Sequence, residues 1–174
     1  MLRKELQPPE INQAVLPEVE NLIKYFEEVL ESEEWDDEGD KIVFADDTVS
    51  REVNEKKSEL EDLIKAKVDI LQFEDYSCAC DAEEMAMDLL MPEAPYVSDI
   101  SVEELTELIN EFQVLEQIAV EHENYYLRLL EKSFKMDVSD YIFWPDTKGM
   151  SLDASPDEIA QKIIEDSKNG QIII

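Results

Sequence analysis

The stretch "SVEELTELINEF", residues 101–112, decides the fold class. Ser101 and Glu104 are three residues apart, which is the pattern of a capping box at the start of a helix. The apolar residues that follow recur every three or four positions: Val102, Leu105, Leu108, Ile109 and Phe112. This spacing places them on one face of a helix. The stretch therefore predicts an amphipathic helix with a buried apolar face.

The same pattern extends toward the N-terminus. A helix of about 17–31 is predicted by one apolar stripe: Val19, Leu22, Ile23, Phe26 and Leu30. A longer stripe follows the cap candidate Ser50, and it consists of Val53, Leu60, Ile64, Val68 and Leu71. Asp81 with Glu84 forms another capping-box pattern and opens a short helix. The N-terminal region is therefore predicted to be helical.

Toward the C-terminus, a further helix is predicted by heptad-like spacing of Leu115, Ile118, His122, Tyr125 and Leu129. Ser155, Pro156 and Glu158 then predict the start of the last helix, because proline suits the first turn and Glu158 completes a capping box. The prediction is an all-α fold with a C-terminal four-helix bundle. A short strand at "KIVF" (41–44) and an extended "QIII" tail (171–174) are the expected exceptions.

The segment "MPEAPYVSD", residues 91–99, breaks the helical pattern with Pro92 and Pro95. It predicts a linker between an acidic helical region, 1–95, and the four-helix bundle, 97–174. The sequence contains a weak internal repeat, in which seven residues recur 100 positions later. The first set is Tyr25, Leu30, Glu31, Asp37, Asp40, Ile42 and Asp46, and the second is Tyr125, Leu130, Glu131, Asp137, Asp140, Ile142 and Asp146. It fits either a degenerate duplication of one unit or chance agreement in a chain rich in Asp and Glu.

Charge limits the classes of partner. The 174 residues include 45 Asp and Glu against 15 Lys and Arg, which gives a formal net charge of −30. A surface this negative repels nucleic acid and anionic membranes and favours basic proteins or cations. No apolar run approaches the roughly 18 residues of a membrane span. We therefore expect a cytoplasmic protein that binds neither nucleic acid nor membrane.

No catalytic pattern is present in the sequence. It has no glycine-rich phosphate loop, no His-based nucleophile arrangement and no His/Glu metal motif, so we expect neither enzymatic activity nor a cofactor. A metal-dependent enzyme that uses clustered carboxylates is the weakest alternative. Cys78 and Cys80 are expected to be free thiols, with a vicinal redox pair as the alternative. His122, the single histidine, is expected to be a packed structural side chain.

The stretch "DYIFWPD", residues 140–146, sets four large apolar residues side by side between two acids. Pro145 disfavours the helical conformation for Trp144, so a helix is expected to end there. Tyr141 and Ile142 are expected in the core, Phe143 partly buried and Trp144 displayed. Aromatic anchors surrounded by acids are typical of a surface that binds a basic protein.

The order and spacing of these motifs carry a resemblance. It rests on "VSDISVEELTELINEF" and on Asp140, Ile142, Phe143, Trp144 and Pro145, followed by Ser155, Pro156, Ile159, Asn169 and Gly170. From about residue 97 to 170 the chain resembles the small four-helix immunity proteins that protect bacteria from nuclease colicins and pyocins. That family has Asp-x-Ile-Tyr-Tyr-Pro where this chain has Phe143 and Trp144 in place of both tyrosines. Glu165 stands where the family usually has tryptophan.

The resemblance implies an immunity protein that binds and inhibits a cognate, basic nuclease toxin domain. The predicted partner-binding residues are Asp140, Phe143, Trp144, Pro145, Asp146, Glu116 and Glu123. No catalytic residue, metal ligand or cofactor is predicted. The alternative is an acidic, non-enzymatic adaptor or nucleic-acid mimic that binds another basic protein by distributed charge.

Overall fold

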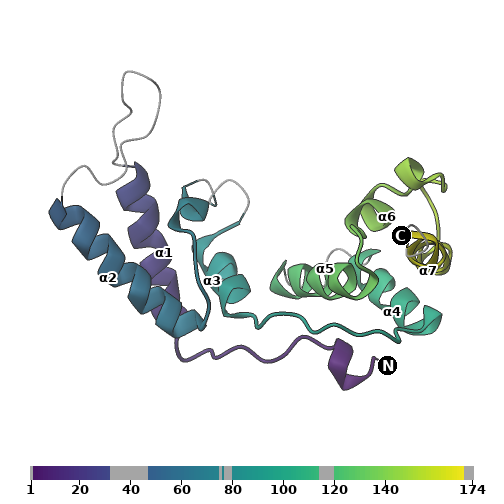
Figure 1. The fold of residues 1–174 in the computed structure, drawn as a ribbon, viewed down its shortest axis with the longest axis horizontal. Helices are drawn as coiled ribbons and strands as arrows, with labels where there is room; N and C mark the ends of the chain where they lie inside the picture. Colours follow the sequence, from purple (N-terminus) through teal and green to yellow (C-terminus); the bar gives the residue numbers. More distant parts are fainter. Residues whose placement is uncertain (1, 32–46, 75, 77–79, 114–119, 171–174) are drawn as a thin grey trace, which may run out of the picture. The chain divides into compact units, whose positions relative to one another are not determined.

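The computed structural model describes residues 2–31, 47–74, 76, 80–113 and 120–170. In this part of the chain all regular structure is helical, which confirms the all-α prediction. The α-helices, shown in Figure 1, are α1 (Leu16–Glu31), α2 (Asp47–Ile64), α3 (Ala82–Leu90), α4 (Val102–Gln113), α5 (Val120–Phe134), α6 (Ser139–Phe143) and α7 (Pro156–Gly170). Short 3-10 helices are η1 (Lys4–Leu6), η2 (Ile70–Phe73) and η4 (Pro145–Lys148). The predicted strand at 41–44 and the tail at 171–174 lie outside the described residues.

The chain divides into two compact units. The N-terminal unit is Glu10–Met91, and the C-terminal unit joins Met1–Pro9 to Pro92–Ile174. The division at Met91 and Pro92 falls within the predicted linker. The sequence-based ranges, by contrast, grouped residues 1–95, whereas here the first nine residues belong with α4 to α7.

In the N-terminal unit, α1 packs against α2, η2 and α3 (Figure 1). All five residues of the predicted α1 stripe are buried, and Phe26 stacks on Phe73 with ring centroids 5.6 Å apart. Asp81 accepts a hydrogen bond from the Glu84 N–H at 2.9 Å, and the Glu84 carboxylate accepts one from the Asp81 N–H at 3.2 Å. The predicted capping box therefore forms. The prediction that α2 begins after Ser50 is wrong, since α2 begins at Asp47.

In the C-terminal unit, α7 packs along α4 and also contacts α5 and α6. The α4 stripe residues Leu105, Leu108 and Ile109 are fully buried, as are Ile159 and Ile163 of α7. Both predicted capping boxes form. The Ser101 N–H donates to Glu104 at 3.0 Å, and the Ser155 N–H donates to Glu158 at 2.8 Å. The capping boxes fix where α4 and α7 begin. The apolar faces of these two helices then pack against each other.

The N-terminal strap, residues 2–9, is fastened to the C-terminal unit. Leu6 is fully buried. The Arg3 guanidinium donates two hydrogen bonds to the Asp99 carboxylate, at 2.8 and 3.1 Å, and its Nε lies 3.2 Å from Glu104 Oε1. The flat guanidinium matches a carboxylate in this two-bond geometry, and the hydrogen bond lowers the pKa of Asp99. The strap is therefore part of the C-terminal unit.

Cys80 and His122 are both half-buried. Cys80 is a half-buried free thiol whose pKa is raised by burial, and Cys78 lies outside the described residues. His122 is half-buried on α5. None of the described helices has the combination of length and apolar composition needed to cross a bilayer.

Candidate partner-binding site

The candidate site is the turn from α6 into η4, here called the α6–η4 turn (residues 139–149). Trp144 leaves the helix with φ −134° and ψ 56°, and Pro145 begins η4. The Trp144 N–H donates to the Asp140 carbonyl at 3.0 Å. The Trp144 carbonyl accepts hydrogen bonds from the Thr147 N–H at 3.0 Å and from the Thr147 hydroxyl at 2.8 Å. The backbone of Trp144 is therefore held from both sides.

Glycine closes the turn. Gly149 has φ 78°, and its N–H donates to the Asp146 carbonyl at 3.1 Å. The Met150 N–H donates to the Pro145 carbonyl at 3.1 Å. A Cβ at position 149 would meet no atom within 4 Å, so the left-handed backbone, and not lack of space, favours glycine here.

Burial changes in steps along the aromatic run. Tyr141 and Ile142 are each 6% exposed, Phe143 is half-buried, and Trp144 is 62% exposed. The Phe143 ring meets Phe112 of α4 edge to face, with centroids 6.0 Å apart. This confirms the burial expected for each of the four residues. The short helix thus turns two side chains into the core and leaves one tryptophan in solvent.

Tyr141 ties α6 to α7. Its hydroxyl donates to Asp166 Oδ2 at 3.0 Å, and Lys162 Nζ lies 3.0 Å from the other oxygen of the same carboxylate. Burial, and then the neighbouring Asp166, raise the pKa of Tyr141 to about 12. The hydroxyl is therefore a neutral donor throughout the physiological pH range. Its hydrogen bond to Asp166 holds α6 against α7.

The acids of the turn differ in how free they are. Lys148 Nζ lies 3.0 Å from Asp140 Oδ2 and 5.0 Å from the centroid of the Tyr141 ring. Asp140 is thus already paired with a cation of its own chain, and its side chain is 45% exposed. Asp146 is exposed to solvent. The carboxylate most open to a partner's basic group is therefore Asp146.

The structure brings five of the seven predicted site residues together in one turn. Pro145 is buried, so it shapes the turn and offers little surface for direct contact with a partner. Glu123 is half-buried on a different element, α5, and Glu116 lies outside the described residues. Leu152, in the loop between η4 and α7, is a 74% exposed leucine that the sequence patterns did not single out. Helical periodicity gives no signal for a loop residue.

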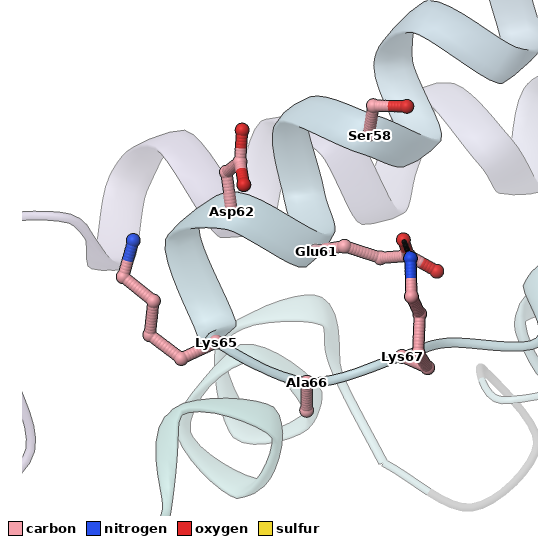
Figure 2. A pocket seen from close by; sticks show the side chains of 6 residues that line it. All are labelled: Ser58, Glu61, Asp62, Lys65, Ala66 and Lys67. Atoms are coloured by element: carbon pink, nitrogen blue, oxygen red, sulfur yellow. Dashed lines mark hydrogen bonds and ion pairs between the residues drawn. The ribbon is translucent and has the colours of Figure 1, made fainter.

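A pocket of about 510 Å³ lies in the N-terminal unit at the C-terminal end of α2 (Figure 2). Lys65 has φ 59° just after this end of the helix. Figure 2 shows Glu61 and Lys67 reaching toward each other, and they form an ion pair. Glu61 also accepts the Val68 N–H at 3.2 Å, and its pKa is lowered, first by Lys67. These contacts hold the C-terminal end of α2. Ser58, the hydroxyl of the lining, donates to the Asn54 carbonyl at 2.9 Å.

Across the described ranges, no group of three His, Cys, Asp or Glu side chains is placed to hold a metal ion. In comparisons with known proteins, no family model matches the chain, and no curated protein or solved structure matches it significantly. The resemblance to immunity proteins therefore depends on the motif residues of the chain itself.

Proposed function

We propose that this chain is an immunity-type protein that binds and inhibits a basic nuclease domain, with Trp144 as the central anchor. One observation carries the proposal: a 62% exposed tryptophan sits on a backbone hydrogen-bonded from both sides. Tryptophan is enriched among the few residues that dominate binding energy. A side chain presented on a fixed backbone also loses less conformational entropy on binding.

Charge supports the same partner class. A nuclease must present a positive surface to phosphates. A protein with net charge −30 is drawn to such a surface, and electrostatic complementarity raises the association rate. Asp146 supplies an exposed carboxylate two residues after the tryptophan. In this proposal α4 to α7 correspond to the four helices of the immunity fold, and the protein acts in the cytoplasm.

The test is Trp144→Ala, with Tyr96→Ala as a matched control. Tyr96 is a 52% exposed aromatic residue of the same unit. The partner to be tested is a basic nuclease domain from a gene adjacent to this one, with affinity and nuclease inhibition as readouts. Trp144→Ala should weaken binding by about 2 kcal/mol, roughly thirtyfold in Kd. Tyr96→Ala should leave the affinity unchanged.

Thermal unfolding separates the anchor from a core residue. An exposed ring contributes little to the core, so the Tm of Trp144→Ala should be nearly that of the parent chain. A buried large aromatic would cost roughly 3–5 kcal/mol of stability when truncated. A variant that melts far lower yet binds normally when folded would contradict the proposal.

The second candidate function is an acidic adaptor or nucleic-acid mimic. The observation that favours it is the charge of the N-terminal unit, where 26 of the 45 acidic residues lie against 7 basic residues. A mimic binds by distributed charge, so Trp144→Ala would leave its affinity intact while added salt abolishes it. An anchored inhibitor should still bind its partner at high salt. Trp144→Ala should abolish this binding at high salt.

A further inference from the structure

A cavity of about 450 Å³ lies in the C-terminal unit and shares no lining residue with the α6–η4 turn. It is formed by the segment before α4, the end of α5 and the last turns of α7. Its lining residues are Tyr96, Val97, Ser98, Ile100, Ser101, Val102, Ser133, Phe134, Ile164, Ser167 and Lys168. This volume falls in the range of pockets that hold small molecules, about 300–1,000 Å³.

The lining combines apolar and hydroxyl groups without a carboxylate. Five apolar side chains along it are only half-buried, because they border open space: Val97, Ile100, Val102, Phe134 and Ile164. In a chain with three times as many acids as bases, the absence of Asp and Glu from this lining is a distinctive property. The pocket at the end of α2 includes Glu61 and Asp62, and a pocket of about 260 Å³ beside the first turns of α7 includes Glu158 and Glu165.

Lys168 is the one charged residue in the lining of this cavity. Lys168 is exposed at the edge and forms no ion pair within the described residues. Lys135 Nζ lies 5.6 Å from the centroid of the Tyr96 ring. Of the acids next to lining residues in sequence, Asp99 is paired with Arg3 of the strap and Asp166 with Lys162. Glu103 and Glu165 are exposed to solvent. The lining itself therefore carries one positive charge and no negative charge, in a chain of net charge −30.

A polar group is also available at the wall. Ser133 is only 8% exposed, and its oxygen accepts a hydrogen bond from the Val97 N–H at 3.1 Å. Within the described residues its hydroxyl hydrogen is donated to no protein acceptor. An oxygen of a bound ligand could accept it.

We propose that this cavity binds a small amphipathic carboxylate. The apolar body lies against Ile100, Phe134 and Ile164, and the carboxylate is at the rim beside Lys168. This site is independent of the proposed inhibitor function, so either can fail without the other.

The probe is octanoate, titrated into the full chain and followed by amide NMR, with 1-octanol as the matched neutral control. We expect saturable shifts at Ser98, Ser133 and Ser167, with a Kd of about 1 mM, as expected for a ligand of this size. Octanol should bind more weakly, because it lacks the charge. Equal binding of octanol, or shifts spread over the surface without saturation, would overturn the proposal.

Two variants locate the charge. Lys168→Gln should weaken octanoate binding about threefold, the size expected for one exposed ion pair. Lys162→Gln removes a lysine from the same helix that is already paired with Asp166, and it should leave binding unchanged. Ile164→Trp should fill the cavity and abolish binding, with the NMR spectrum reporting that the variant is folded. An equal effect of both lysine variants would contradict the assignment.

Discussion

At the scale of single residues, the aromatic run shows how one step along the chain changes the role of a side chain. Ile142 is buried and Trp144 is exposed only two positions later. Pro145 is responsible for this change, because the residue before a proline is disfavoured in the helical region. The helix ends at Phe143, so the next ring is directed by the turn and not by helical periodicity.

Tyr141→Phe tests the hydrogen bond that joins α6 to Asp166 of α7. At pH 7 the loss of the hydrogen bond to Asp166 should cost about 1.5–3 kcal/mol, the range for a bond to a charged group. The pKa of Tyr141 is raised from 10.0 to about 12 on folding. The stabilisation is therefore fully present below pH 10 and is lost as the pH rises toward 12.

Urea unfolding at pH 7 and at pH 11 would measure the difference in free energy between the parent chain and Tyr141→Phe. That difference should shrink at the higher pH. Tyr96→Phe, at an exposed tyrosine, is the control and should have no effect at either pH. A difference that is the same at both values would show that the hydroxyl does not stabilise the fold in its neutral form.

At the scale of elements, capping boxes fix where helices begin. Asp81 starts α3, and Ser155 starts α7. The Ser155 N–H and hydroxyl lower the pKa of Glu158, as expected for a carboxylate that accepts hydrogen bonds. Each cap satisfies backbone N–H groups that the helix leaves without internal partners.

Asp81→Ala and Ser155→Ala should each cost about 1 kcal/mol. Because the two caps lie in different units, the double variant should show the sum of the two losses. Hydrogen exchange would assign each loss to its own unit, and Ser98→Ala, at an exposed serine, is the control. A loss of protection in the opposite unit would contradict independent capping.

At the scale of the whole molecule, the sequence of the N-terminal unit, residues 10–91, interrupts the sequence of the C-terminal unit, which consists of the strap and residues 92–174. The strap contributes a fully buried leucine and the Arg3 contacts. Residues 97–174 by themselves therefore lack part of their own core. A fragment of the C-terminal unit should be made with residues 1–9 rejoined to residue 92 through a flexible linker.

Leu6→Ala tests this topology in the full chain. It should destabilise the C-terminal unit by about 2–5 kcal/mol, the cost of truncating a buried leucine. Hydrogen exchange should show the loss in α4 and α7, while α1 to α3 remain protected. Leu16→Ala is the matched control, because Leu16 is buried in the core of the N-terminal unit and should produce the opposite pattern. Lost protection in α1 after Leu6→Ala would refute the assignment of the strap.

The sequence by itself determined the helical class, three capping boxes and the apolar faces of α1 and α4. It also predicted the burial order from Tyr141 to Trp144. These features depend on residues within one or two turns of each other, so spacing and local backbone preferences are sufficient to predict them.

Only the tertiary structure decided which distant groups meet. Arg3 and Asp99 are 96 positions apart, and Tyr141 and Asp166 are 25 apart. No periodicity relates such pairs, because their proximity depends on the packing of whole helices. The same holds for three other features: the burial of Leu6, the pairing of Lys148 with Asp140 in the turn, and the carboxylate-free cavity. Each combines segments that are brought together only when the apolar faces are buried.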